Sequence, residues 1–319
     1  MILQEDGMEY TLLKNSDLTV SRIGMGGCPM GQYGWGKVAE SDLIGAVHTS
    51  LDQGITLFDT ADTYGLGQSE INLAKALGPN RKEAIIASKF GVRVENGHTF
   101  YDNSPTWIHQ ALENSLRRLN TDYIDLYQVH YRDGVTPISV VVDTLEDLKK
   151  QGYIRCYGLS NISEEDLSEL LPYEGCFVSF QDEYSLACRK HEKTMTTLAE
   201  KLNMTPVTWG SLGQGILTGK YDRDTLFGSD DRRSRDVYVN FHGEKLLKNL
   251  EIVDAMKSIA QNHDRPVSAV AIRFILDYLP DSVVLCGAKR PAQVLGNAAG
   301  SGWTLDPEEL RTLDEISRD

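Results

Sequence analysis

Residues 54–65 read Gly54-Ile55-Thr56-Leu57-Phe58-Asp59-Thr60-Ala61-Asp62-Thr63-Tyr64-Gly65. The apolar run from Ile55 to Phe58 stands between a glycine and polar residues, a pattern typical of a buried strand. Asp59 comes where that strand ends, and Tyr64 lies in the loop that follows. An acid and a phenol at the end of a strand are either catalytic residues or residues that only stabilise the loop. The segments that follow distinguish the two.

A helix-like stretch followed by a short apolar strand recurs along the chain. After the loop, Ser69 as N-cap and Gly78 as stop signal predict a helix over 69–77. Further helices are predicted at 41–53, 104–119, 137–150, 163–172, 191–202 and 245–262, after Pro266, after Pro291 and from Asp306. Strands are predicted at 23–27, 55–58, 84–89, 124–130, 153–160, 177–181, 206–209 and 282–286.

Eight strands separated by helices predict an α/β fold with a parallel sheet, and eight units favour closure into a (β/α)8 TIM barrel. The stretch from Gly24 to Cys28 lacks the third glycine of G-x-G-x-x-G, which argues against a Rossmann domain. Alternating residues on both sides of Asn15-Ser16-Asp17 predict a short N-terminal β-hairpin. We expect a single domain over residues 1–319 with an extra C-terminal helix, because no linker or shift of composition divides the chain.

Composition narrows the class of protein. A hydrophobic content of 41% and a charged content of 24% are ordinary for a globular protein, and the formal net charge is −14. That charge argues against binding to nucleic acid or to an anionic membrane surface. The five cysteines are widely spaced without a C-x-x-C pair, the N-terminus is acidic, and no apolar run approaches the ~18 residues of a membrane span. We therefore expect a cytoplasmic protein without a structural metal.

Ionisable residues end three consecutive predicted strands. Asp59, Lys89 and His130 stand at these ends, and Tyr64 follows the first of them. In a barrel the carboxyl ends of the strands form the active-site mouth. Each residue alone has a structural explanation, as a loop cap, a surface charge, a rim histidine or a packing ring. Together they exceed what a packed core requires.

The four groups suit proton donation to an oxygen. A free phenol has a pKa of about 10, and an adjacent ammonium such as Lys89 is expected to lower it. Asp59 would hold Lys89 in place, and His130 would orient a carbonyl oxygen. No activated serine or cysteine accompanies the set, which argues against nucleophilic catalysis. A single histidine at the mouth argues against metal-dependent hydrolysis.

The chain resembles the aldo-keto reductase family over nearly its whole length. The segment from Gly54 to Glu70 is close to the family signature, and further agreement follows at 126–130, 158–161, 181–186 and 212–220. The resemblance implies a (β/α)8 carbonyl reductase dependent on NAD(P)H. It implies a catalytic tetrad in which Tyr64 is the general acid, Lys89 and Asp59 tune it, and His130 orients the substrate, namely Asp59, Tyr64, Lys89 and His130.

The resemblance also implies cofactor-binding positions. Three of them match residues that bind the nicotinamide carboxamide, Ser160, Asn161 and Gln181. Trp209 matches an aromatic ring stacked on the nicotinamide, where a tyrosine is more common. The remaining positions match the first strand's approach to the cofactor, the pyrophosphate loop and the adenosine end: Gly26, Gly27, Gly210, Leu212, Gln214, Lys220, Gly287, Lys289, Arg290, Gln293 and Asn297.

The charges of Lys289 and Arg290 suit a 2′-phosphate, which favours NADPH over NADH. Two departures from the family pattern weaken that preference, because Gly296 stands where relatives often carry an acid and Gln293 replaces an arginine. A solvated helix start is the other explanation of the basic pair.

Substrate choice in such barrels lies in the loops. Aromatic residues in the predicted loops, with Tyr101 among them, are candidates for a wall that suits a sugar-like or small carbonyl substrate, and we expect contacts from Tyr33, Trp35, Phe100 and Tyr131. The alternative function is an NADPH-binding redox sensor resembling potassium-channel β subunits, which would hold the cofactor with little turnover.

Overall fold

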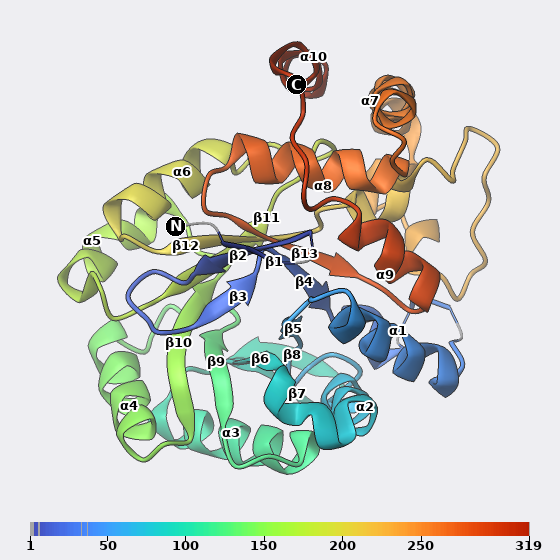
Figure 1. The fold of residues 1–319 in the computed structure, drawn as a ribbon. Coiled ribbons are helices and arrows are strands. Elements are labelled where there is room, and N and C mark those ends of the chain that lie inside the picture. The colour runs from blue at the N-terminus through green and yellow to red at the C-terminus, as the bar shows by residue number, and fades with distance from the viewer. Residues whose placement is uncertain (1–2, 6, 33, 37, 319) are drawn as a thin grey trace.

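Eight parallel strands close into a barrel in the computed structural model, which describes residues 3–5, 7–32, 34–36 and 38–318 (Figure 1). Neighbouring strands pair in the order β10-β11-β12-β13-β4-β5-β6-β9, and every pair is parallel. The strands are β4 (Ile23–Gly26), β5 (Leu57–Asp59), β6 (Ile85–Phe90), β9 (Ile124–Val129), β10 (Ile154–Ser160), β11 (Ser179–Glu183), β12 (Thr205–Trp209) and β13 (Val283–Gly287). The predicted (β/α)8 architecture is confirmed.

Helices surround the barrel. They are α1 (Glu40–Asp52), α2 (Gln68–Leu77), α3 (Pro105–Leu119), α4 (Ile138–Lys150), α5 (Leu167–Leu170), α6 (Glu192–Lys201), α7 (Gly243–Asn262), α8 (Val267–Tyr278), α9 (Pro291–Ala298) and α10 (Pro307–Ser317). Short 3-10 turns are η1 (Cys28–Gly31), η2 (Gly78–Glu83), η3 (Glu164–Asp166), η4 (Leu171–Tyr173), η5 (Gly213–Thr218), η6 (Arg232–Ser234) and η7 (Val239–Phe241). Within the described residues, no helix has the length and apolarity needed to cross a membrane.

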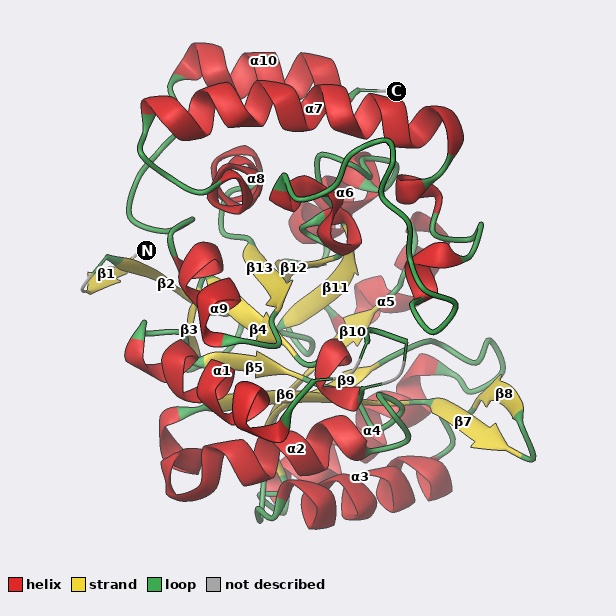
Figure 2. Ribbon diagram, turned by 90° about the vertical axis from the view of Figure 1, so that its right-hand side faces the viewer, coloured by secondary structure: helices red, strands yellow, loops and turns green. Residues whose placement is uncertain are grey.

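Two helices are extra to the eight-fold repeat. The predicted C-terminal helix is α10, and Figure 2 shows it beside α7, with both helices outside α8. Eight consecutive residues of α8, from Ala269 to Leu276, are buried. A helix that is buried along consecutive residues needs cover on all sides. The barrel covers one side of α8, and α7 with α10 covers the other.

An antiparallel sheet closes the amino-terminal end of the barrel. It contains β1 (Leu3–Glu5), β2 (Met8–Leu12) and β3 (Thr19–Ser21), so the predicted hairpin is confirmed as β2 and β3 and gains a third strand. Val20 of β3 packs with the lower apolar layer of the barrel, which includes Leu57 and Leu126. Leu13 and Leu18, in the connection between β2 and β3, belong to the same layer. The barrel is thereby plugged at this end, which leaves the carboxyl ends of the strands as its mouth.

A second hairpin stands beside the mouth. Strands β7 (Val92–Glu95) and β8 (His98–Tyr101) pair antiparallel between β6 and α3, and Figure 2 shows them projecting from the barrel. The turn residues Asn96 and Gly97 have positive φ angles of 50° and 79°. Such angles at both central positions define the tight turn that Asn-Gly favours.

Candidate active site

Asp59 and Lys89 form a buried ion pair at the mouth. Asp59 ends β5 and Lys89 lies near the end of β6, and these two strands are neighbours. The Lys89 ammonium donates to Asp59 Oδ1 at 2.6 Å and to the Thr60 carbonyl at 3.0 Å. Because the ammonium has two acceptors and the carboxylate a direct cation, the burial of both charges is compensated.

Tyr64 and His130 complete the predicted tetrad. The ring centroids of Tyr64 and His130 are 5.8 Å apart in an edge-on arrangement, and Lys89 Nζ lies 5.2 Å from the Tyr64 centroid. His130 is anchored through its backbone, which donates to the Phe90 carbonyl at 2.8 Å. Its buried Nδ1 has no hydrogen-bond partner among the described residues. The structure therefore gathers all four predicted residues and leaves one imidazole nitrogen unpaired.

Burial sets the protonation of these two rings. Burial and then the Asp59 carboxylate raise the pKa of Tyr64 well above its ordinary value. The expectation that Lys89 lowers this pKa is wrong for the structure as described, because the ammonium is directed to Asp59 and Thr60. Burial and then the Lys89 charge lower the pKa of His130 to about 3. At neutral pH the phenol is protonated and the imidazole is neutral.

Close backbone contacts fix the loop that carries Tyr64. A Cβ atom on Gly65 would lie 2.2 Å from the Gly31 carbonyl oxygen, and one on Gly31 would lie 2.7 Å from the Tyr64 carbonyl carbon. Gly65 also has a positive φ of 61°, which glycine adopts without strain. Larger side chains at either position would push the segment after β4 away from Tyr64.

Ser69 has a different role from the one predicted. Helix α2 begins at Gln68 with Gly67 as its N-cap, so Ser69 is not the cap. Its hydroxyl donates to the Gly27 carbonyl at 2.7 Å and accepts from Thr60 at 2.8 Å. The serine therefore ties the end of β4 to the Tyr64 loop, a long-range contact that competes with local capping.

The three residues expected at the nicotinamide carboxamide form one hydrogen-bonded group. Ser160 Oγ and the Asn161 backbone N–H donate to the Gln181 carbonyl at 3.1 and 2.8 Å. The Asn161 side-chain amide donates to Ser160 Oγ and to the His130 carbonyl, at 3.1 and 3.0 Å. The group lies directly beside the tetrad because it contacts His130.

Three glycines at the first and last strands bring the backbone close to the mouth. Gly26 is paired with Gly287 in the sheet, and the Gly27 N–H donates to the Asp59 carbonyl at 2.6 Å. A Cβ atom on Gly27 would lie 2.7 Å from that carbonyl oxygen. No larger residue fits at Gly27 because of this contact, and the approach of the first strand to the cofactor stays a prediction.

The loop after β12 turns sharply at its start. It contains left-handed residues at Gly210, Gly213, Gln214 and Gly215. The N–H groups of Gly213 and Gly215 donate to the carbonyls of Gly210 and Leu212, so pyrophosphate binding by this loop stays a prediction. Of the other residues predicted here, Trp209 ends β12 half-buried, Leu212 packs on the core and Lys220 is exposed. The side chain of Gln214 instead holds the loop, since it donates to Glu183 and accepts from Asn240.

The basic residues after β13 already have protein partners. Lys289 Nζ donates to the Trp35 carbonyl at 2.5 Å, and Arg290 donates to Asp42 at 3.2 Å. Gln293 accepts from the Lys289 backbone N–H, and Asn297 is buried on α9. Arg290 is exposed, so only its surface ion pair must break before it can bind an anion.

The aromatic residues expected at the substrate site do not lie together at the mouth. Tyr131 stacks on His130 at 5.1 Å and on Tyr101 at 5.0 Å, which forms a continuous stack from β8 to the tetrad. The Phe100 ring lies against the Arg93 guanidinium, with 5.0 Å between the ring centroid and Cζ. The backbone of Trp35 forms an isolated antiparallel β-bridge with Asp231 in the loop before α7. Tyr33 lies outside the described residues. Tyr101, and not Phe100, thus stacks on Tyr131, and the substrate contacts of these residues stay predictions.

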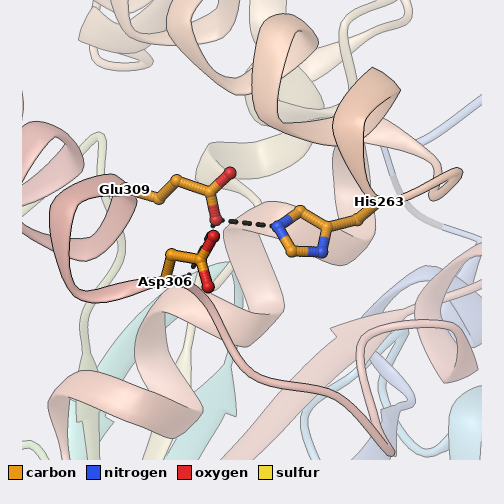
Figure 3. Close-up of side chains that lie close together, drawn as sticks. All are labelled: His263, Asp306 and Glu309. Atoms are coloured by element: carbon orange, nitrogen blue, oxygen red, sulfur yellow. Dashed lines mark hydrogen bonds and ion pairs between the residues drawn. The ribbon is translucent and has the colours of Figure 1, made fainter.

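A group with metal-ligand chemistry lies away from the mouth. Figure 3 shows His263 after α7 facing Asp306 and Glu309 at the start of α10. Glu309 and Asp306 form a capping box, and His263 Nε2 lies 2.8 Å from Glu309 Oε2. Helix capping and a clamp between two helices account for these contacts, and no further observation points to a bound ion.

Comparisons with known proteins agree with the geometry. The Aldo/keto reductase family model matches residues 22–318. The aldo-keto reductase YhdN of Bacillus subtilis is 35% identical over 97% of this chain and 93% of its own length. The NADH-specific methylglyoxal reductase of Escherichia coli is 28% identical over 97% of this chain and 98% of its own.

A solved structure shares the fold closely. The glycerol dehydrogenase AKR11B4 of Gluconobacter oxydans superposes with a TM-score of 0.86 at 34% identity, and the match covers 96% of this chain and 94% of that one. The match of the family model to nearly the whole chain, together with these relatives, leads to one conclusion: the chain belongs to the aldo/keto reductase family and is an NAD(P)H-dependent oxidoreductase.

Proposed function

We propose that residues 1–319 form one catalytic domain that reduces an aldehyde or ketone to an alcohol with NADPH. The observation that carries this proposal is the tetrad, in which the Lys89–Asp59 pair, Tyr64 and His130 converge at the barrel mouth. These four groups supply the proton donor and the orienting group that carbonyl reduction needs.

Tyr64 is the proton donor in this proposal. Its pKa is raised, so the phenol holds its proton at neutral pH. As hydride adds to the carbonyl carbon, the electrons of the C=O π bond move to oxygen, and the phenol O–H protonates that oxygen. His130, whose imidazole is neutral, orients the same oxygen by a hydrogen bond. The phenolate that remains lies beside Lys89, whose Nζ is 5.2 Å from the centroid of the ring.

The residues at the mouth fit a nicotinamide dinucleotide. Ser160, Asn161 and Gln181 offer polar atoms suited to a carboxamide, and the loop from Gly210 to Lys220 is the proposed pyrophosphate site, where the Lys220 ammonium is exposed. Trp209 is the proposed stacking ring. When bound, the cofactor supplies the hydride.

NADPH is preferred in this proposal because Lys289 and Arg290 lie together where the adenosine end is expected. The test is a steady-state comparison of the two cofactors with one carbonyl substrate. A kcat/KM for NADPH at least tenfold above that for NADH is expected, and a tenfold preference for NADH would reject the assignment.

The proposed substrate is a small polar carbonyl compound, with sugar-like hydroxy-aldehydes and ketones included. Two relatives point this way, since one is named for methylglyoxal and one for glycerol. Within this chain, the Tyr131 ring stacked on His130 offers an aromatic face beside the tetrad.

The function is tested with the wild type and Tyr64→Phe on a panel of sugars, aldehydes and ketones. The wild type should oxidise NADPH with a member of the panel, whereas Tyr64→Phe should retain less than a tenth of that turnover and bind NADPH nearly as well. Tight NADPH binding without turnover of any carbonyl would instead indicate the redox-sensing alternative.

A further inference from the structure

One buried glutamine lies directly below the catalytic residues. Along β9, Leu126 faces the lower layer of the barrel and Tyr127 packs in the outer core against the helices. Side chains alternate along a strand, so Gln128 faces the interior between Leu126 and His130. Its side chain is fully buried.

The amide of Gln128 contacts both the tetrad and the carboxamide group. Gln128 Nε2 donates to Asp59 Oδ2 at 3.3 Å, and Gln181 Nε2 donates to the same oxygen at 2.8 Å. Gln181 Nε2 also donates to Gln128 Oε1 at 3.3 Å. The two amides and the carboxylate thus form a closed triangle of hydrogen bonds.

Asp59 and Gln128 together determine which way the Gln181 amide faces. An ionised carboxylate only accepts hydrogen bonds, so each glutamine must present its NH2 group to Asp59. The Gln181 NH2 group has two hydrogens, and Asp59 and Gln128 accept both. Among the described residues no donor reaches Gln181 Oε1. That oxygen is therefore the part of the amide left for a ligand, and it suits the NH2 group of a carboxamide.

We propose that Gln128 is a positioning residue that presents Gln181 Oε1 to the nicotinamide carboxamide and thereby links cofactor binding to the Asp59–Lys89 pair. The inference rests on the proposed function for the identity of that ligand. The hydrogen-bonded triangle itself does not depend on it.

The first test examines the triangle in the protein without cofactor. Gln128→Leu removes the Gln128 Oε1 acceptor and should therefore shift the side-chain NH2 resonances of Gln181 in ¹H–¹⁵N spectra. Gln128→Asn keeps a buried amide but shortens the side chain, and it should shift the same resonances. Tyr127→Phe is the matched control, because the Tyr127 hydroxyl is buried without a partner on the opposite face of the same strand. Unchanged Gln181 resonances in both Gln128 variants would overturn the inference, whatever the enzyme reduces.

The second test examines the link to the cofactor. NADP⁺ is compared with its 3-acetylpyridine analogue, which has a methyl group in place of the carboxamide NH2. The wild type and Tyr127→Phe should bind the analogue about fivefold more weakly, the value of one hydrogen bond. In Gln128→Leu this ratio should fall below about twofold. An equal ratio in wild type and Gln128→Leu would overturn the inference, whereas failure of the proposed function would appear as absent carbonyl turnover by the wild type.

Discussion

The Nζ atom of Lys89 lies 2.6 Å from Oδ1 of Asp59, and neither side chain is more than 4% exposed. Removal of one partner from such a pair leaves an uncompensated buried charge, which costs about 3–5 kcal/mol. Asp59→Asn should therefore lower both kcat and the free energy of unfolding measured in urea. Asp59→Asn/Lys89→Met should recover part of the stability and none of the activity.

The exposed pair of Lys75 and Glu40 is the control for this prediction. It has the same 2.6 Å separation but more than half of each side chain is exposed. Lys75→Met should change the free energy of unfolding by less than about 1 kcal/mol. An equal loss in Asp59→Asn and Lys75→Met would contradict the assigned importance of the buried pair.

The protonation of Tyr64 predicts opposite pH profiles for the two reaction directions. Reduction needs the phenol, whose raised pKa keeps it protonated, so its rate should stay level from about pH 6 to 9. Oxidation of the alcohol needs the phenolate and should rise about tenfold per pH unit. Initial rates in both directions measure this. A decline in reduction centred near pH 7 would assign the proton to another group.

The hairpin residues Tyr101 and Phe100 are neighbours with different expected effects. Tyr101 belongs to the stack that reaches His130 through Tyr131, whereas Phe100 covers Arg93. Tyr101→Ala should raise KM for the carbonyl up to about tenfold with kcat nearly unchanged, because a stacked pair is worth about 0.5–1.5 kcal/mol. Phe100→Ala should leave KM unchanged. Equal effects of the two variants would exclude the stack as a substrate wall.

The barrel and its tetrad were predictable from the sequence because both follow from local patterns. A short apolar run predicts a strand, and its last polar residue then faces the mouth, as Asp59 and His130 do. The different orientations of Phe100 and Tyr101 could also be predicted from the sequence. Asn96-Gly97 is a strong signal for a two-residue turn, which pairs Phe100 with Arg93 and places Tyr101 on the other face.

Other features depend on contacts distant in the sequence. Ser69 has the local pattern of a helix cap, yet its hydroxyl bonds Gly27 of the first strand. Gln128 joins Asp59, 69 positions away, and Gln181, 53 positions away. Whether a buried amide meets a carboxylate depends on the register of three strands, which no single segment encodes.

The neutral state of His130 predicts a specific loss of stability in acid. In the unfolded chain its pKa is about 6.5, and in the folded protein burial lowers the pKa to about 3. Below pH 6.5 the unfolded state binds a proton that the folded state does not, so this contribution to stability is complete above pH 6.5 and declines as the pH falls toward 3.

Between pH 7 and pH 5 the decline from His130 should amount to about 2 kcal/mol, since each pH unit below about 6.5 costs about 1.36 kcal/mol. Urea unfolding of the wild type and of His130→Gln at both pH values isolates it, because other titrating groups act equally on the two proteins. The variant should lose about 2 kcal/mol less than the wild type over this interval. Equal losses would show that the imidazole accepts a proton in the folded protein, and His130 could then act as an acid as well as an orienting group.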